Sequence, residues 1–167
     1  IPCYDEEVVL EDPLLRPLTA ACKETVGDDF EIILGDDGSR DQTRELLHAA
    51  QYEDSHITAV FLLRNYGYQL ALSAGLSIAR DERIFLLDAN LQDPPELLGP
   101  MMTRLDEGYH VVYGRRKSRK GDDALRRTSA NVFYRLMSRM IEFDIPLDTG
   151  DFRLTRRCVA DVLKDML

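Results

Sequence analysis

Residues 86–96 read LLDANLQDPPE, an apolar run that breaks into polar side chains and is closed by two prolines. The polar side chains belong to Asp88, Asn90, Gln92 and Asp93. Oxygen ligands clustered where a buried strand ends are typical of places where α/β proteins bind a hard divalent cation and the phosphates it neutralises. The prolines end the strand and start the next helix, so the cluster is expected at the carboxyl edge of a sheet. For this motif alone, an acidic turn without a ligand is the alternative.

Strand-like and helical patterns alternate outward from this stretch in both directions. Near-continuous apolar strands are expected at residues 30–34, 57–63, 83–88 and 110–114. Helices are expected up to Ala50, with Ser39 and Gln42 as a capping box, and over 69–79, 95–107, 124–140 and the last ten residues. The alternation predicts one α/β domain, with a mostly parallel central sheet and helices on both faces.

Length and composition are those of one globular domain, with 167 residues, 44% hydrophobic and 31% charged. No apolar run approaches the roughly 20 residues that a membrane-spanning helix needs. The chain begins without Met and ends inside the helical pattern CVADVLKDML, so residues 1–167 are expected to be one domain of a longer protein. Its three cysteines, Cys3, Cys22 and Cys158, lack metal-site spacing and are expected to be reduced, as in the cytosol.

Charge is unevenly distributed along the chain. The net charge of −9 argues against general nucleic-acid binding. Residues 114–127, GRRKSRKGDDALRR, nevertheless carry seven basic and two acidic side chains, a local +5 that leaves −14 for the remainder. Such a basic island suits a specific anion, either a phosphate or an anionic membrane surface. A solvated loop is the alternative.

Six polar motifs leave the expected strand ends in order. They are IPCYDEE (1–7), DDGSRDQT (36–43), RNYGYQLALSAG (64–75), DANLQDPPE (88–96), VYGRRKSR (112–119) and DTGDFRL (148–154). Because the carboxyl ends of parallel strands share one edge, these motifs are expected to converge on one cleft. The ordered set resembles the family 2 glycosyltransferases, whose single Rossmann-like domain is called the GT-A fold. The resemblance covers the whole chain and is strongest to the polyprenyl-phosphate branch, which includes dolichol-phosphate mannose synthase.

The resemblance implies a nucleotide site built from the first three motifs. Its predicted members are Pro2, Tyr4, Glu6, Asp36, Asp37 and Gln69. The paired acids would hold the base and ribose, because carboxylates accept hydrogen bonds from ring N–H groups and ribose hydroxyls. The sequence departs mildly from the family at Asp5, where Asn is usual, and at Gly35.

The fourth and sixth motifs imply the cation site and the catalytic groups. Asp88, Asn90 and Gln92 would reach a divalent cation, Mg²⁺ or Mn²⁺, and the diphosphate. Asp88 and Asp151 are the predicted catalytic residues. Asp88 would act through the cation, whereas Asp151, like Asp148, lies where related enzymes with hydroxyl acceptors place their general base. Either residue could instead cap the turn before the last helix.

The basic motif implies the acceptor site. Arg116 occupies the family's Y-G-x-R position, and Arg119 and Arg127 (or Arg126) are expected to join it on an acceptor phosphate. Guanidinium groups suit this ligand because their paired donors match phosphate oxygens.

The activity implied is inverting, metal-assisted transfer of a sugar from a UDP- or GDP-linked donor to a polyprenyl phosphate at the cytoplasmic membrane face. Membrane segments after residue 167 would anchor the full protein, residues 1–167 alone would be soluble, and a homo-oligomer is compatible with the resemblance. The alternatives are transfer to a sugar hydroxyl, a nucleotide-sugar-binding domain impaired by Asn90, and a nucleotidyltransferase. The last usually needs a Gly- and Lys-rich phosphate loop, which IPCYDEE lacks.

Overall fold

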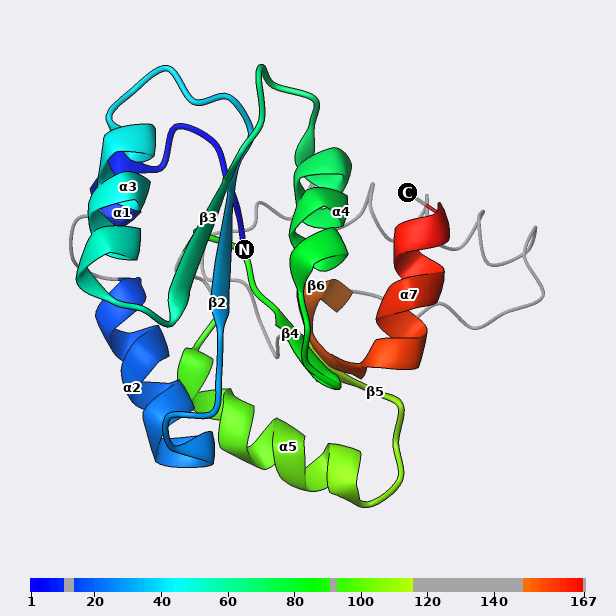
Figure 1. Ribbon diagram of the computed structural model, residues 1–167. Helices are drawn as coiled ribbons and strands as arrows, with labels where there is room; N and C mark the ends of the chain where they lie inside the picture. Colours follow the sequence, from blue (N-terminus) through cyan, green and yellow to red (C-terminus); the bar gives the residue numbers. More distant parts are fainter. Residues whose placement is uncertain (11–13, 91–92, 116–148, 167) are drawn as a thin grey trace, which may run out of the picture. The chain divides into compact units, whose positions relative to one another are not determined.

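The computed structural model describes residues 1–10, 14–90, 93–115 and 149–166, with the backbone alone at 115, 149–151 and 165 (Figure 1). The chain divides into two compact units, residues 1–113 with 151–167 and residues 114–150. The site below belongs to the first unit, and so does the fold apart from residues 114–115 and 149–150, where two strands reach into the second unit. Four predicted site residues lie outside the described residues: Gln92, Arg116, Arg119 and Arg127.

In the part of the chain that the structure describes, six strands form two three-stranded sheets. In the first sheet, β1 (Pro2–Cys3), β2 (Ile32–Asp36) and β3 (Ile57–Phe61) lie in that order and are parallel. The second sheet has the order β4 (Arg83–Leu86), β6 (Thr149–Arg156) and β5 (Val111–Arg115), with β4 antiparallel to β6. The α/β class expected from the sequence is confirmed, but the expected central sheet is divided in two.

Helices cover both faces of these sheets (Figure 1). They are α1 (Glu7–Leu10), α2 (Leu15–Val26), α3 (Thr43–Glu53), α4 (Tyr68–Ile78), a 3₁₀ turn η1 (Pro95–Leu97), α5 (Leu98–Asp106) and α7 (Arg157–Met166). Helix α3 packs on β2 and β3, whereas α4 packs on β1 and β2 and contacts α7. Leu18, Leu34, Leu47, Leu105 and Leu154 belong to the larger buried cluster. A second cluster of Leu72, Leu76, Ile84, Leu86 and Ala160 lies between α4, α7 and β4.

Two expectations about local structure were wrong. Ser39 and Gln42 form no capping box, because α3 begins at Thr43 and the Ser39 hydroxyl instead accepts the Asp5 N–H at 3.0 Å. The stretch 148–154, expected as a loop because of its polar composition, contributes most of β6. Long-range strand pairing overrides local polarity in β6, since its partner β4 lies far away in the sequence.

The first and second motifs are tied together by backbone hydrogen bonds. The Glu6 N–H donates to Thr43 Oγ1 at 2.8 Å, and the Gln42 N–H donates back to Glu7 Oε2 at 3.1 Å. Asp5 adopts φ +53°, a left-handed conformation for which Asn and Asp are enriched among non-glycine residues. This conformation gives a physical reason why an Asx residue suits that position.

The second and third motifs touch through their backbones. Gly38 has φ +71°, and a Cβ placed on it would lie 2.4 Å from the Arg64 carbonyl carbon and 2.7 Å from the Asn65 nitrogen. No side chain fits in this space. Gly38 therefore permits the loop after β2 to lie directly against the loop that precedes α4.

We expect Gly38→Ala to destabilise the protein more than Gly27→Ala does. Both glycines have similar positive φ values, +71° and +69°, but nothing lies within 4 Å of a Cβ at Gly27. Gly27→Ala should therefore lower the free energy of unfolding only through backbone strain, by about 1–3 kcal/mol. Gly38→Ala should lower it by roughly 1–3 kcal/mol more, because its Cβ also clashes with the neighbouring loop. Urea unfolding followed by circular dichroism measures both, and equal losses would contradict the backbone contact.

Candidate functional site

A pocket of about 340 Å³ lies where β1, β2 and β4 end and α4 begins. It is lined by Pro2, Cys3, Tyr4, Glu6, Asp37, Asn65, Gly67, Tyr68, Ala71, Asp88, Ala89 and Asn90. The first, third and fourth polar motifs therefore meet here, together with Asp37 of the second motif. This is the edge where open α/β sheets place their ligands.

Six of the predicted site residues line this pocket: Pro2, Tyr4, Glu6, Asp37, Asp88 and Asn90. Asp36 is fully buried and lies outside the lining. Gln69 is exposed on the first turn of α4 and also lies outside it. Asp151 belongs to β6, and the direction of its side chain is not described.

Asp37 organises the loop before α4. Its Oδ1 accepts the Tyr66 N–H at 2.7 Å and its Oδ2 accepts the Gly67 N–H at 2.8 Å. The carboxylate is only 3% exposed, so these charge-assisted bonds are shielded from water. The sequence indicated a ligand-binding acid here but gave no sign of this backbone role.

Asp36 anchors the turn behind the pocket. Its Oδ2 accepts hydrogen bonds from Arg44 Nε at 3.0 Å and Nη2 at 2.9 Å, while Oδ1 accepts the Ser39 N–H at 2.9 Å. Arg44 also donates to the Leu62 carbonyl at 2.9 Å. Contact between Asp36 and a nucleoside stays a prediction, and it would require this network to open.

Asp88 is held from α4 by a residue that the sequence analysis missed. The Tyr68 hydroxyl donates to Asp88 Oδ1 at 2.8 Å, and the Asn90 amide donates to Oδ2 at 3.4 Å. Tyr68 follows Gly67, whose φ of +96° turns the chain into the helix. Its position inside the motif RNYGYQ was the one available signal, because nothing local predicts a partner 20 residues away.

The pocket is electrically negative. Burial, and then the neighbouring carboxylates of Asp41 and Asp88, raise the pKa of Glu6. Carboxylates that repel one another in a cleft favour a bound cation, which would relieve the repulsion. The Cys3 thiol also lines the pocket, but burial raises its pKa to about 12, so it stays protonated and is a poor nucleophile.

The described residues of this pocket suit a divalent cation that is shared with a bound ligand. Among the described residues, no three His, Cys, Asp or Glu side chains are grouped as a metal site. Asp88 supplies one carboxylate, and the Asn90 amide can turn its oxygen toward an ion. Mg²⁺ typically keeps several waters and uses one or two carboxylates together with substrate phosphates. The residues therefore suit a cation that is shared with a bound diphosphate.

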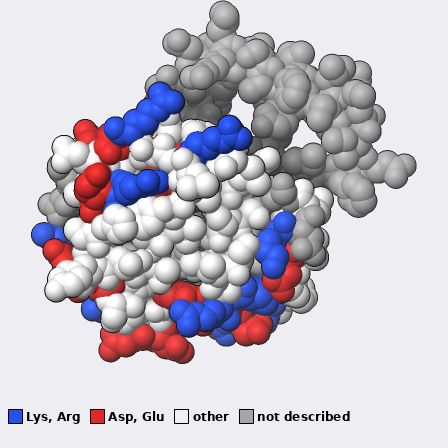
Figure 2. Space-filling model, turned by 45° about the horizontal axis from the view of Figure 1, so that its top comes forward, with Lys and Arg blue, Asp and Glu red and all other residues white. Residues whose placement is uncertain are grey.

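On the described surface, basic and acidic side chains lie close to one another around an area that has neither (Figure 2). In the part of the chain that the structure describes, no helix combines the length and apolarity needed to cross a membrane. The basic island 114–127 lies almost wholly outside the described residues.

Comparison with known proteins gives consistent results. The sequence profile of glycosyl transferase family 2 matches residues 1–163. The chain is 40% identical over 164 residues to the uncharacterized glycosyltransferase YkcC of Bacillus subtilis (strain 168), covering 98% of the chain and 50% of that protein. It is also 40% identical over 168 residues to the undecaprenyl-phosphate 4-deoxy-4-formamido-L-arabinose transferase of Enterobacter sp. (strain 638), covering 98% and 49%. The chain thus spans about half the length of these curated relatives.

Solved structures agree on the fold. The mannosyltransferase PcManGT from Pyrobaculum calidifontis, in complex with GDP-Man and Mn²⁺, superposes with a TM-score of 0.65 at 19% identity. The match covers 97% of this chain and 44% of that one. It confirms the GT-A fold expected from the ordered motifs.

We expect Asp36→Asn and Asp37→Asn to differ in their effect on nucleotide binding. Each replaces a buried carboxylate that accepts charge-assisted bonds, so each should lower the free energy of unfolding by roughly 1.5–3 kcal/mol. Only Asp37 lines the pocket, so only Asp37→Asn should also weaken binding of UDP or GDP. Denaturant titration and calorimetry separate the two effects. Unchanged nucleotide affinity in Asp37→Asn would refute the prediction that Asp37 belongs to the nucleotide site.

Proposed function

Because this chain belongs to glycosyl transferase family 2, we propose that it transfers a sugar from a nucleotide-diphosphate sugar to a polyprenyl phosphate, inverting the anomeric centre. The observation that carries the proposal is the negative pocket at the strand ends, which Asp37 and Asp88 both line. The reaction would take place at the cytoplasmic face of a membrane, with further segments of the full protein providing the anchor.

The donor half of the proposal rests on the pocket. Tyr4 and Asn65 line it with side chains that can contact a base or ribose, and Asp37 sets the loop that carries Asn65. At about 340 Å³, its volume falls within the roughly 300–1,000 Å³ usual for small-ligand sites. PcManGT, which was solved with GDP-Man, gives the same proposal independent support at the level of the fold.

The part of the proposal that concerns the cation rests on Asp88 and Asn90. A divalent ion bound with the diphosphate offsets the charge that develops on the leaving group. Asp88 would hold that ion through one carboxylate oxygen, while the Tyr68 hydroxyl fixes the rotation of the carboxylate through the other. The Mn²⁺ found with PcManGT supports this proposal without deciding between Mg²⁺ and Mn²⁺.

The acceptor half rests on charge and on a relative. The name of the 40% identical Enterobacter enzyme specifies undecaprenyl phosphate, and the basic island would supply guanidinium groups for such a phosphate. A phosphate is already ionised at pH 7, so positioning it for in-line attack is enough. A sugar hydroxyl would instead need a general base, for which Asp151 is the candidate.

The test is a product assay with the full-length protein, a panel of UDP- and GDP-sugars, and polyprenyl phosphate in vesicles. We expect a lipid-linked sugar product of inverted configuration. Arg116→Ala combined with Arg127→Ala should raise the KM for the lipid phosphate about tenfold or more, because each lost charge-assisted contact contributes about 1.5–3 kcal/mol. Nucleotide affinity should stay nearly unchanged in the double variant. Unaltered lipid kinetics would exclude the basic island as the acceptor site.

We further expect the cation to bind weakly to the protein alone and well with nucleotide present. Asn90→Asp should tighten binding of Mn²⁺ in the presence of UDP or GDP by about fivefold or more, since a unit charge 4 Å away contributes about 1 kcal/mol even in water. Calorimetry and the electron paramagnetic resonance signal of free Mn²⁺ measure this without turnover.

Asn65→Asp is the matched control, because it adds the same charge to the same pocket from a different loop. Equal tightening in both variants would mean that the effect is general electrostatics. Turnover that appears only in Asn90→Asp would mean that the natural chain is a nucleotide-sugar-binding domain and not a working transferase.

A further inference from the structure

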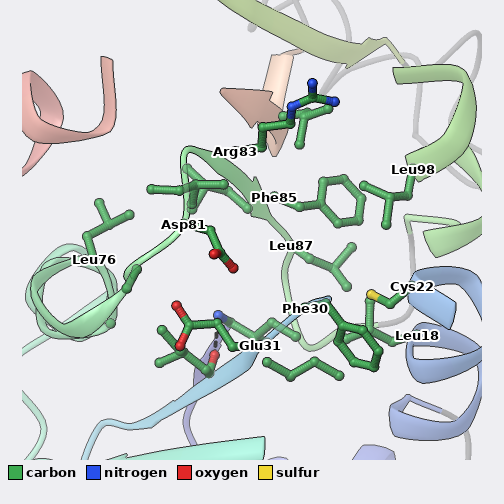
Figure 3. Close-up of a pocket in the computed structure, with 18 of the residues that line it drawn as sticks. Leu18, Cys22, Phe30, Glu31, Leu76, Asp81, Arg83, Phe85, Leu87 and Leu98 are labelled. Carbon is green, nitrogen blue, oxygen red and sulfur yellow. Dashed lines mark hydrogen bonds between the residues drawn. The ribbon is translucent and has the colours of Figure 1, made fainter. Parts of the chain in front are cut away.

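Helix α4 and strand β4 approach each other mainly through apolar side chains. Leu72 and Leu76 of α4 belong to the same buried cluster as Leu86 of β4. All three also line a mainly apolar cavity of about 520 Å³, and Figure 3 shows Leu76 and Leu87 on different sides of it. Apolar contacts have no preferred direction, so they do not orient a polar side chain. The orientation of Asp88, which directly follows Leu87, therefore depends on polar contacts.

A polar contact crosses from α4 to this carboxylate. The Tyr68 hydroxyl donates to Asp88 Oδ1 at 2.8 Å, whereas the Asn90 amide reaches Oδ2 only at 3.4 Å. The first distance is that of a good hydrogen bond and the second is that of a weak one. A carboxylate has about four acceptor sites, so a cation can displace the amide at Oδ2 while the hydroxyl keeps Oδ1. The Tyr68 hydroxyl thereby sets the direction in which Oδ2 is offered.

The other end of this contact is held by the loop before α4. The two residues that precede the helix donate their N–H groups to Asp37 at 2.7 and 2.8 Å. A Cβ placed on Gly35 of β2 would lie 3.2 Å from the Ala71 carbonyl oxygen, so the first turn of α4 lies close against β2. Tyr68 is the first residue of this helix, and its aromatic side chain has few rotatable bonds. The position of the loop is therefore transmitted directly to Asp88.

The hydrogen bond between Tyr68 and Asp88 is open to influence from a ligand. Tyr68 is 37% exposed, so water competes with Asp88 for its hydroxyl. Both residues line the negative pocket, together with Asn65 and Gly67 of the loop. A ligand in this pocket covers the hydrogen bond, and a hydrogen bond is electrostatically stronger where water is excluded.

We propose that Tyr68 is a positioning residue that couples the nucleotide site to the cation site. A nucleotide that contacts the loop before α4 holds the Tyr68 hydroxyl on Asp88, and a cation then meets a carboxylate that is already oriented. The cation in turn stabilises the loop, because coupling between two sites acts equally in both directions. The inference rests on the proposed function and adds to it a protein path between the two ligands.

The direct attraction between the cation and the diphosphate is the other source of coupling, and it needs no protein residue. A nucleoside separates the two sources, because uridine and guanosine have the base and ribose of UDP and GDP but no phosphate to share with an ion. Any effect of a nucleoside on cation binding must therefore pass through the protein.

The test compares two variants that each lose one phenolic hydroxyl. Tyr68→Phe removes the donor to Asp88 and keeps the ring. Tyr66→Phe is the matched control, because it makes the same change two residues earlier. The Tyr66 ring lies under the Arg64 guanidinium, 4.9 Å from its carbon, and is outside the pocket lining.

The first measurement is Mn²⁺ binding, followed by the electron paramagnetic resonance signal of the free ion. We expect the nucleoside of whichever nucleotide binds, UDP or GDP, to tighten Mn²⁺ binding to the unaltered chain by about fivefold or more, the lower end of the usual range for coupled sites. Tyr66→Phe should keep this gain and Tyr68→Phe should lose it. With the full nucleotide, Tyr68→Phe should keep only the part of the gain that the diphosphate provides.

The second measurement is hydrogen exchange of the Tyr66 and Gly67 amides, which donate to Asp37. Mn²⁺ alone should slow their exchange in the unaltered chain and in Tyr66→Phe, but not in Tyr68→Phe. Neither measurement depends on turnover. The Tm of each variant without ligands shows whether it is folded.

Equal nucleoside gains in the two variants would overturn the inference, and so would loop amides whose exchange Mn²⁺ leaves unchanged in the unaltered chain. A lower Tm in Tyr68→Phe with intact coupling would mean that the hydroxyl is only structural. If neither UDP nor GDP binds, the proposed function fails together with the inference. If nucleotide and Mn²⁺ bind and Tyr68→Phe leaves their coupling unchanged, the inference alone fails.

Discussion

The candidate site depends on one buried carboxylate that faces two backbone amides. Asp37 binds the N–H groups of Tyr66 and Gly67, and Gly38 beside it lets the two loops meet without a side chain between them. Once this contact is made, α4 starts at a fixed place, and Tyr68 on its first turn reaches Asp88. A series of short-range contacts therefore connects the loop after β2 to the carboxylate after β4. The pocket has its shape because each of these contacts fixes the position of the next.

The sequence was informative where local pattern and chain order decide the outcome. Strand β3 was expected from the near-continuous apolar run at residues 57–63, and helix α4 from the helical segment over 69–79. The ordered polar motifs identified the edge at which Asp37 and Asp88 would meet. It was uninformative where a distant partner decides. DTGDFRL forms part of β6 only because β4 is available for pairing. Likewise, no neighbouring residue signals that Asp36 pairs with Arg44 while Asp37 turns to a different loop.

The negative character of the pocket gives the neutral side chain of Asn90 a physical meaning. Asn90 carries no charge, so Asp88 is the one carboxylate that the end of β4 contributes to the described pocket lining. Glu6 already has a raised pKa beside it, so a further acid would add to the repulsion in the absence of a cation. A neutral amide at residue 90 reduces that repulsion, and under the proposed function the diphosphate would supply more of the oxygens that hold the ion.

The division into two sheets also bears on preorganisation. Asp37 follows a strand of the first sheet and Asp88 a strand of the second, so the two halves of the pocket are carried by separate sheets. Tyr68 is a bridge between them. A ligand that touches both halves must spend part of its binding free energy on their alignment wherever the sheets can shift. Packing that holds the two sheets rigidly together would remove this cost in free energy. The apolar interior away from the pocket would therefore help to set the affinity of the pocket for its ligand.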